Sequence, residues 1–103
     1  MIGAAIEVHR ELGPGMLESV YEEALTHELG LLGLRAVRQA EIDVLYKGVV
    51  IKGQRLDLLV EGSVVVELKA VSAVLDIHKA QVLSYLRAGR FPLGLLINFN
   101  KKL

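Results

Sequence analysis

The chain has 103 residues, and its 12 Lys and Arg residues balance its 12 Asp and Glu residues, so the formal net charge at pH 7 is zero. This balance excludes a strongly basic nucleic-acid coat protein and an acidic disordered tail. Hydrophobic residues make up 52% and charged residues 23% of the sequence, which is typical of a globular protein, and the lack of cysteine excludes disulfides, zinc–thiolate clusters, Fe–S sites and a cysteine nucleophile.

The N-terminal apolar stretch Ile2–Ile6 is followed at once by Glu7, His9 and Arg10. It is too short and too polar for a signal peptide or a membrane span, so we expect a cytoplasmic protein without a membrane partner. A chain of this length buries about two-thirds of its surface on folding. We therefore expect one domain over residues 1–103.

Two helices are predicted first. Apolar residues recur at helical spacing over Ile2–Leu12, and Gly13-Pro14-Gly15 ends this first helix. A second apolar stripe through Tyr21, Leu25 and Leu29 predicts a helix within 16–32, with glutamates in its first turns, where the helix dipole favours anions.

The pattern then changes to short β-type runs. The predicted strands are Ala36–Tyr46, Gly48–Ile51, Arg55–Val60 and Val64–Lys69. Asp76 is a candidate cap for a third helix over Ile77–Ala88, with Leu83 and Leu86 as its apolar face, and Pro92–Phe99 is a final buried strand. Two helices, three or four strands, a helix and a strand indicate an α/β or α+β sandwich.

The hairpin over residues 55–69 has a register that the sequence itself favours. A turn centred on Gly62 gives one aliphatic face, whose pairs are Val60 with Val64, Leu58 with Val66, and Leu56 with Leu68. The other face then pairs Leu59 with Val65, Asp57 with Glu67, and Arg55 with Lys69. A slip of one residue would turn the two acids toward the core.

In this register the Cβ atoms of Asp57 and Glu67 lie about 5 Å apart. The repulsion between their carboxylates is destabilising unless a cation lies between them. Hard oxygen ligands suit Mg²⁺ or Mn²⁺, and Lys69 leaves the strand on the same side as Glu67. A catalytic metal site is one interpretation. The other is an edge hairpin in which Arg55 and Lys69 neutralise the two acids.

Other polar residues occupy helical positions. Gln81 and Tyr85 stand one turn apart with His78 on the same flank, and they favour either a ligand-binding group or a half-buried polar edge. Glu18 is either a first-turn acid or a further acid aimed at the hairpin. His9 is interpreted as a packing histidine and His27 as a surface residue.

The segment Gly15-Met-Leu-Glu18-Ser-Val-Tyr21 resembles the signature of the GxxExxY proteins, and the resemblance extends over nearly the whole chain. That family is placed in the PD-(D/E)XK nuclease-like superfamily. The resemblance implies a restriction-endonuclease-like αβββαβ core, with a small mixed sheet flanked by helices and one extra short N-terminal helix.

The resemblance also implies roles for single residues. Asp57 corresponds to the first motif acid, Glu67 and Lys69 to the (D/E)XK element, and Glu18 to the acid of the leading core helix. Gln81 and Tyr85 look like the QxxxY element of the RecB-like and lambda-exonuclease-like branch. The acids, with a main-chain carbonyl near that of Leu68, would hold Mg²⁺ or Mn²⁺ as cofactor.

Two functions remain as expectations. The first is a Mg²⁺-dependent nuclease acting on single- or double-stranded DNA. The second is a non-catalytic nucleic-acid-processing or protein-binding module on the same scaffold, because aromatic residues make up only 5% of the chain and offer few stacking platforms. A homodimer or a protein partner is also compatible with short edge strands such as residues 35–46.

The zero net charge conceals an uneven distribution. Residues 1–34 hold Arg10 against six glutamates, whereas residues 35–103 hold 11 basic and 6 acidic residues. The predicted sheet and third helix therefore form the basic part of the chain, which is the part expected to meet phosphates.

Overall fold

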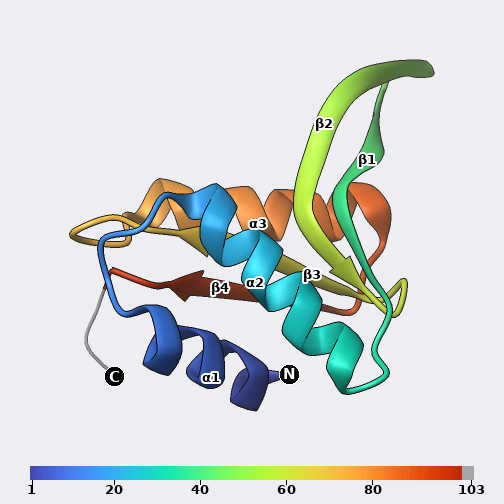
Figure 1. Ribbon diagram of the computed structural model, residues 1–103. Coiled ribbons are helices and arrows are strands. Elements are labelled where there is room, and N and C mark those ends of the chain that lie inside the picture. The colour runs from blue at the N-terminus through green and yellow to red at the C-terminus, as the bar shows by residue number, and fades with distance from the viewer. Residues whose placement is uncertain (101–103) are drawn as a thin grey trace.

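The computed structural model describes residues 1–100. They form one sheet with helices packed on both of its faces (Figure 1). The helices are α1 (Ile2–Leu12), α2 (Glu18–Leu31) and α3 (Asp76–Gly89), and the strands are β1 (Ala36–Tyr46), β2 (Val49–Val60), β3 (Val64–Lys69) and β4 (Leu93–Asn98). The sheet order is β1-β2-β3-β4; β1, β2 and β3 are antiparallel neighbours, and β4 runs parallel to β3. The predicted α/β fold with an extra N-terminal helix is confirmed.

Each face of the sheet carries its own apolar cluster. Helices α1 and α2 cover one face, where Tyr21, Leu25, Leu29, Leu58 and Val66 are among the fully buried residues. Helix α3 covers the other face through Tyr85, against Ile42, Leu56 and Val65. Within residues 1–100, no helix is long and apolar enough to cross a membrane.

Strand β2 is longer than predicted, because the two runs Gly48–Ile51 and Arg55–Val60 belong to one strand. The register between β1 and β2 shifts by one residue near Gly53, which forms a β-bulge. Gly53 has a φ of +104°, a conformation that glycine adopts readily and that strains other residues. This bulge carries the strand through the polar stretch that the sequence pattern treated as a break. Lys47 and Gly48, both with positive φ, form the tight turn of the hairpin.

The sheet coils sharply where Gln39 on β1 passes Asp57 on β2. Arg38 pairs with Leu58 and Ala40 pairs with Leu56, but no pair joins Gln39 to Asp57, and Gln39 has a left-handed φ of +52°. Leu58 faces α1 and α2, whereas Leu56, two residues away, packs with the α3 cluster. The ladder of pairs between β1 and β2 is thus interrupted beside Asp57.

The Gly62-centred register is confirmed for three pairs, Leu58 with Val66, Leu59 with Val65, and Val60 with Val64. Its predicted continuation is wrong: pairing of β2 with β3 ends at Leu58, so Leu56 and Arg55 do not pair with Leu68 and Lys69. The coil of β2 is the reason, because it turns Leu56 to the opposite face of the sheet.

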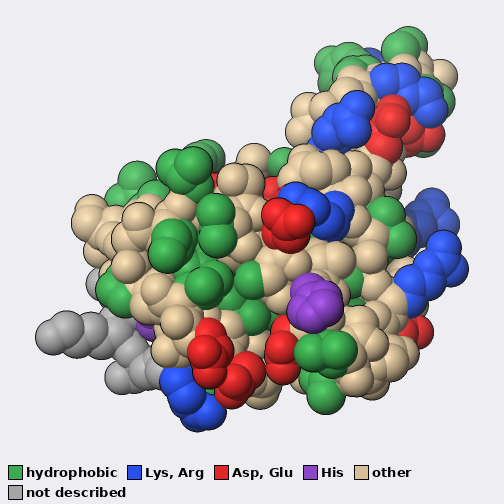
Figure 2. All heavy atoms as spheres, viewed as in Figure 1, with side chains coloured by type: hydrophobic (Ala, Val, Ile, Leu, Met, Phe, Trp, Pro, Cys, Tyr) green, Lys and Arg blue, Asp and Glu red, His purple; other side chains and the backbone are tan. Residues whose placement is uncertain are grey.

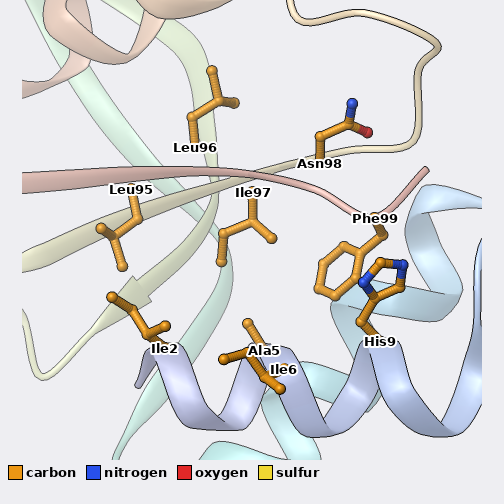
Figure 3. A pocket seen from close by; sticks show the side chains of 9 residues that line it. All are labelled: Ile2, Ala5, Ile6, His9, Leu95, Leu96, Ile97, Asn98 and Phe99. Carbon is orange, nitrogen blue, oxygen red and sulfur yellow. The ribbon is translucent and has the colours of Figure 1, made fainter. Parts of the chain in front are cut away.

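Helix α1 packs along β4, and a shallow groove runs between them (Figure 3). Ile2 and Ile6 of α1 face Leu95 and Ile97 of β4 across the groove, and the His9 ring meets the Phe99 ring edge-on, with centroids 5.9 Å apart. His9 is buried and His27 is exposed, as expected.

Two details of α3 differ from the prediction. Leu75 is the N-cap residue and Asp76 is the first residue of the helix, so Asp76 does not cap it. Leu83 is 55% exposed, whereas the predicted Leu86 is partly buried and packs beside the buried Val82 and Tyr85. The helix is rotated relative to the predicted stripe, which turns Tyr85 toward the hairpin acids.

Candidate active site

Asp57 and Glu67 are joined by hydrogen bonds that replace the missing strand pairs. The backbone N–H of Asp57 donates to Glu67 Oε1 at 3.1 Å, and the backbone N–H of Leu68 donates to Asp57 Oδ2 at 2.8 Å. Each acid therefore accepts a main-chain hydrogen bond from the opposite strand. The predicted meeting of these two carboxyl groups occurs, although through side chain-to-backbone bonds and not through a ladder pair.

Glu67 is the most buried acid of the site, with 4% of its surface exposed. Desolvation and the nearby charge and hydrogen bond of Asp57 raise the pKa of Glu67 to about 8, and the charge of Lys69 opposes this rise. Two carboxyl groups in this position repel one another when both are ionised. The pair therefore shares a proton or requires a cation.

Lys69 lies two residues beyond Glu67, on the same face of β3, and is half-buried. Its neighbour on β4 is Asn98, whose side chain exchanges hydrogen bonds with the backbone of Val71. Within residues 1–100, the Lys69 ammonium group forms no ion pair shorter than 4.0 Å. The Lys69 charge therefore lowers the pKa of Glu67 through space, without a direct ion pair.

Helix α3 brings its predicted pair to the site. Gln81 Nε2 donates to the Tyr85 hydroxyl at 3.0 Å. Burial raises the pKa of Tyr85, and the charge of Glu67 raises it further, so the hydroxyl lies within electrostatic reach of the hairpin acids. His78 shares a groove with Gln81 and Tyr85, but its Nδ1 accepts the backbone N–H of Leu75 at 3.0 Å and closes the start of α3.

Glu18 approaches the site from the first turn of α2. Its Oε2 accepts the backbone N–H of Ala70 at 3.2 Å, just after the end of β3. Glu18 also lines a small cavity together with Asp57 and Leu68. The structure thus brings Glu18 to the hairpin on the side opposite α3.

Glu22 is a site neighbour that sequence reasoning missed. It is 6% exposed, lines the same cavity, and accepts hydrogen bonds from Arg38 Nε at 3.0 Å and from Gln39 Nε2 at 2.7 Å. Arg38 Nη2 lies 3.0 Å from the same carboxylate. The signal that was available is the spacing of Glu18 and Glu22, one helical turn apart beside the apolar stripe.

The Gly15-x-x-Glu18-x-x-Tyr21 motif has a local structural role. The hydroxyl of Tyr21 donates to the carbonyl of Gly13 at 2.5 Å and accepts the backbone N–H of Met16 at 3.1 Å. Gly15, with φ of +105°, lets the loop turn back over this hydroxyl. Tyr21 thereby holds the segment from which Glu18 projects.

The acids are compatible with a hard divalent cation, but they do not enclose one. Within residues 1–100, no three His, Asp or Glu side chains gather closely enough to hold a metal ion by themselves. Mg²⁺ keeps several water ligands and is often held by one or two carboxylates. The close approach of the half-buried Asp57 and the buried Glu67 is the feature that a cation would relieve.

Comparison with known families agrees with this geometry. The family model described as the PD-(D/E)XK nuclease superfamily matches residues 1–103. The chain belongs to the PD-(D/E)XK nuclease superfamily. Neither the search of curated proteins nor the search of solved structures produced a match. The matched residues include Asp57, Glu67 and Lys69, to which the resemblance described above gives the motif roles.

Proposed function

We propose that the protein is a nuclease that uses Mg²⁺ or Mn²⁺ to hydrolyse phosphodiester bonds of DNA. The observation that carries this proposal is the pair of hydrogen bonds that holds Asp57 and Glu67 together at the open end of the β2–β3 ladder. Membership of the nuclease superfamily supports the same activity. Assignment to the GxxExxY group and to the RecB-like branch belongs to this proposal.

Asp57 and Glu67 would hold the cation, assisted by the main chain at Leu68 and by the Glu18 carboxylate. Carboxylate and carbonyl oxygens are the ligands that Mg²⁺ and Mn²⁺ prefer. When bound, the cation supplies Lewis-acid activation of water and of the phosphate. The bonds from Leu68 N–H to Asp57 and from Ala70 N–H to Glu18 orient these carboxylates before any ligand arrives.

Lys69 and α3 would act on the substrate. The ammonium of Lys69 stabilises negative charge that develops on the phosphate in the transition state. The Gln81–Tyr85 hydrogen bond orients an amide and a hydroxyl that position the phosphodiester. The excess of basic residues after residue 34 favours DNA binding on this part of the molecule.

Cleavage of labelled single-stranded and duplex DNA, with Mg²⁺, Mn²⁺ or a chelator, tests the proposal. Lys69→Ala and Glu67→Ala are each expected to lower the cleavage rate by about 10²-fold or more. Glu11→Ala, an exposed substitution on α1 outside the site and outside the basic part of the chain, is the control and leaves the rate unchanged. Activity that survives unchanged in both site variants belongs to a contaminant and contradicts the proposal.

A non-catalytic binding module is the second candidate. The observation that favours it is that the described acids do not by themselves enclose a metal. Calorimetric titration with Mn²⁺ separates the two candidates. A nuclease is expected to bind the ion, and Asp57→Asn is expected to weaken that binding. DNA binding without Mn²⁺ binding would favour the module.

A further inference from the structure

The tip of the β1–β2 hairpin extends beyond the rest of the sheet as an arm, which we define as residues 43–53 (Figures 1 and 2). Strand β2 pairs with β3 only over Leu58–Val60, so the arm is a two-stranded ribbon with open edges among the described residues. Isolated two-stranded ribbons are marginally stable in water. The arm therefore lacks the support that the other strands receive.

Apolar side chains cover both faces of the arm. Its exposed apolar residues are Leu45 (71%), Tyr46 (59%), Val49 (60%), Val50 (51%) and Ile51 (44%). The register pairs Tyr46 with Val49 on one face and Leu45 with Val50 on the other. Exposed apolar edge strands pair readily with other strands unless something covers them. The arm has the character of an interface on both faces.

The charges of the arm disfavour nucleic acid as its partner. Lys52 Nζ lies 2.8 Å from Asp43 Oδ1, and the Lys47 ammonium stands 5.5 Å from the centre of the Tyr46 ring. Lys52 is thus neutralised within the arm, and Lys47 is its one remaining cation among residues 43–53. An apolar partner with a single complementary acid fits this surface better than a phosphate backbone does.

We propose that the partner is a second copy of this chain, joined through the outer edge of β1 in an antiparallel pair centred on Val44. This alignment places Glu41 opposite Lys47 of the second copy and Ile42 opposite Tyr46 of the second copy. The two-fold symmetry repeats both contacts, so two ion pairs lie outside a centre in which Val44 is opposite Val44 and Asp43 is opposite Leu45 of the second copy. The sheets of the two copies then form one continuous sheet.

Glu41 is available for this contact. It is exposed and lies opposite Arg55 in the β1–β2 register, yet the two side chains form no ion pair among residues 1–100. Shifting the centre of the pair by one residue in either direction removes the match of Glu41 with Lys47. Centring the pair on Leu45 would place Asp43 opposite Lys47 of the second copy, but Asp43 is already paired with Lys52 at 2.8 Å. The register centred on Val44 is therefore the one that engages a carboxylate without an ion pair among residues 1–100. Only the outer edge of β1 meets the second copy in this arrangement, so we expect a weak interface, below the roughly 800 Å² per partner of a standard complex, with a micromolar dissociation constant.

Sedimentation velocity of the full chain over a range of concentrations tests the proposal. Lys47→Glu and Glu41→Lys each turn two attractive pairs into two repulsive pairs, and each is expected to weaken the dimer about tenfold. The double variant Glu41→Lys/Lys47→Glu restores the pairs with opposite polarity and recovers the dimer. Arg87→Glu, an exposed change on α3, is the control and leaves the dimer intact.

Circular dichroism checks that each variant is folded. We expect all of them to fold, because Glu41 and Lys47 are both exposed. A wild-type chain that is monomeric at 100 times the expected dissociation constant overturns the proposal. A double variant no more associated than the single variants overturns the register. Sedimentation of a monomeric wild-type chain with anionic lipid vesicles would assign the apolar arm to a membrane surface and would likewise refute the dimer.

Discussion

The side-chain amide of Gln39 donates a 2.7 Å hydrogen bond to Glu22. The backbone of Gln39 itself is left-handed, with a φ of +52°. A residue other than glycine in that conformation stores of the order of 1 kcal/mol of strain. The distortion stands opposite Asp57, at the point where β1 and β2 lose one pair. Glu22 therefore stabilises the backbone shape on which the position of Asp57 depends.

Substitution Glu22→Ala is expected to lower the free energy of unfolding by about 2 kcal/mol, because the amide of Gln39 and the guanidinium of Arg38 lose their acceptor. For a chain of this size the midpoint of thermal unfolding would fall by roughly 10 °C. Glu23→Ala, at an exposed position of the same helix, is the control. Equal unfolding midpoints for the two variants would contradict a stabilising role of Glu22.

The raised pKa of Glu67 predicts a pH dependence of stability in the metal-free protein. The ordinary value of 4.5 applies to the unfolded chain and a value of about 8 to the folded chain. Between these values the folded state binds the proton that the unfolded state has lost, so stability falls as pH rises from about 5 to about 8. Urea unfolding in the presence of a chelator at several pH values measures this slope.

Glu67→Gln is the control for that measurement, since the amide keeps the shape of the side chain and cannot titrate. The variant is expected to lose the part of the slope that Glu67 contributes. A metal that binds the ionised carboxylate stabilises the wild type most at high pH, because binding no longer has to displace the proton. Identical pH profiles for wild type and Glu67→Gln would show that Glu67 titrates normally.

Tyr21→Phe tests the role of the Tyr21 hydroxyl. The substitution keeps the ring stacked on Phe99, whose centroid lies 4.5 Å away, but leaves the carbonyl of Gly13 and the N–H of Met16 without their partner. We expect a loss of about 1 to 3 kcal/mol in unfolding free energy. Tyr46→Phe, at an exposed position, should change stability by less than about 0.5 kcal/mol. Equal losses would contradict the prediction.

Two glycines should respond in opposite directions to alanine. A Cβ at Gly94 of β4 would lie 2.7 Å from Val82 Cγ1 of α3, so Gly94→Ala is expected to cost about 1 to 3 kcal/mol. A Cβ at Gly30, inside α2, meets nothing within 4 Å, so Gly30→Ala should stabilise by about 0.5 to 1 kcal/mol. Chemical denaturation of both variants measures these changes in the free energy of unfolding. Stabilisation by Gly94→Ala would mean that α3 is more loosely packed on β4.

Local patterns were sufficient to predict most of the elements. The helix over residues 2–12 and the Gly62-centred pairing of β2 with β3 were predicted from neighbouring residues. The helix is confirmed, and the pairing is confirmed for the three pairs nearest the turn. The bulge at Gly53 was missed because a lone glycine in a polar stretch is as common in a turn as in a strand.

The site was harder to predict than the elements. The closeness of Asp57 and Glu67 was inferred from a ladder that continues to Arg55 and Lys69. The observed β2–β3 ladder ends at Leu58 and Val66, and the two acids meet through side chain-to-backbone hydrogen bonds just beyond its end. The β1–β2 ladder is also interrupted beside Asp57, at Gln39, whose side chain is held by Glu22 of α2. No spacing rule along the chain connects Glu22 with Gln39. The catalytic roles of the site residues remain predictions for the assays described above.

The stacking of Tyr21 on Phe99 joins two elements separated by most of the chain, and His9 meets the same Phe99 ring. Strand β4 also pairs with β3 only after the chain has passed through α3. Contacts between such distant segments form late, because a long loop must close before they bring any gain. Folding should therefore be slow for a chain of this length, with α1 and α2 gaining protection from amide exchange only when β4 has docked.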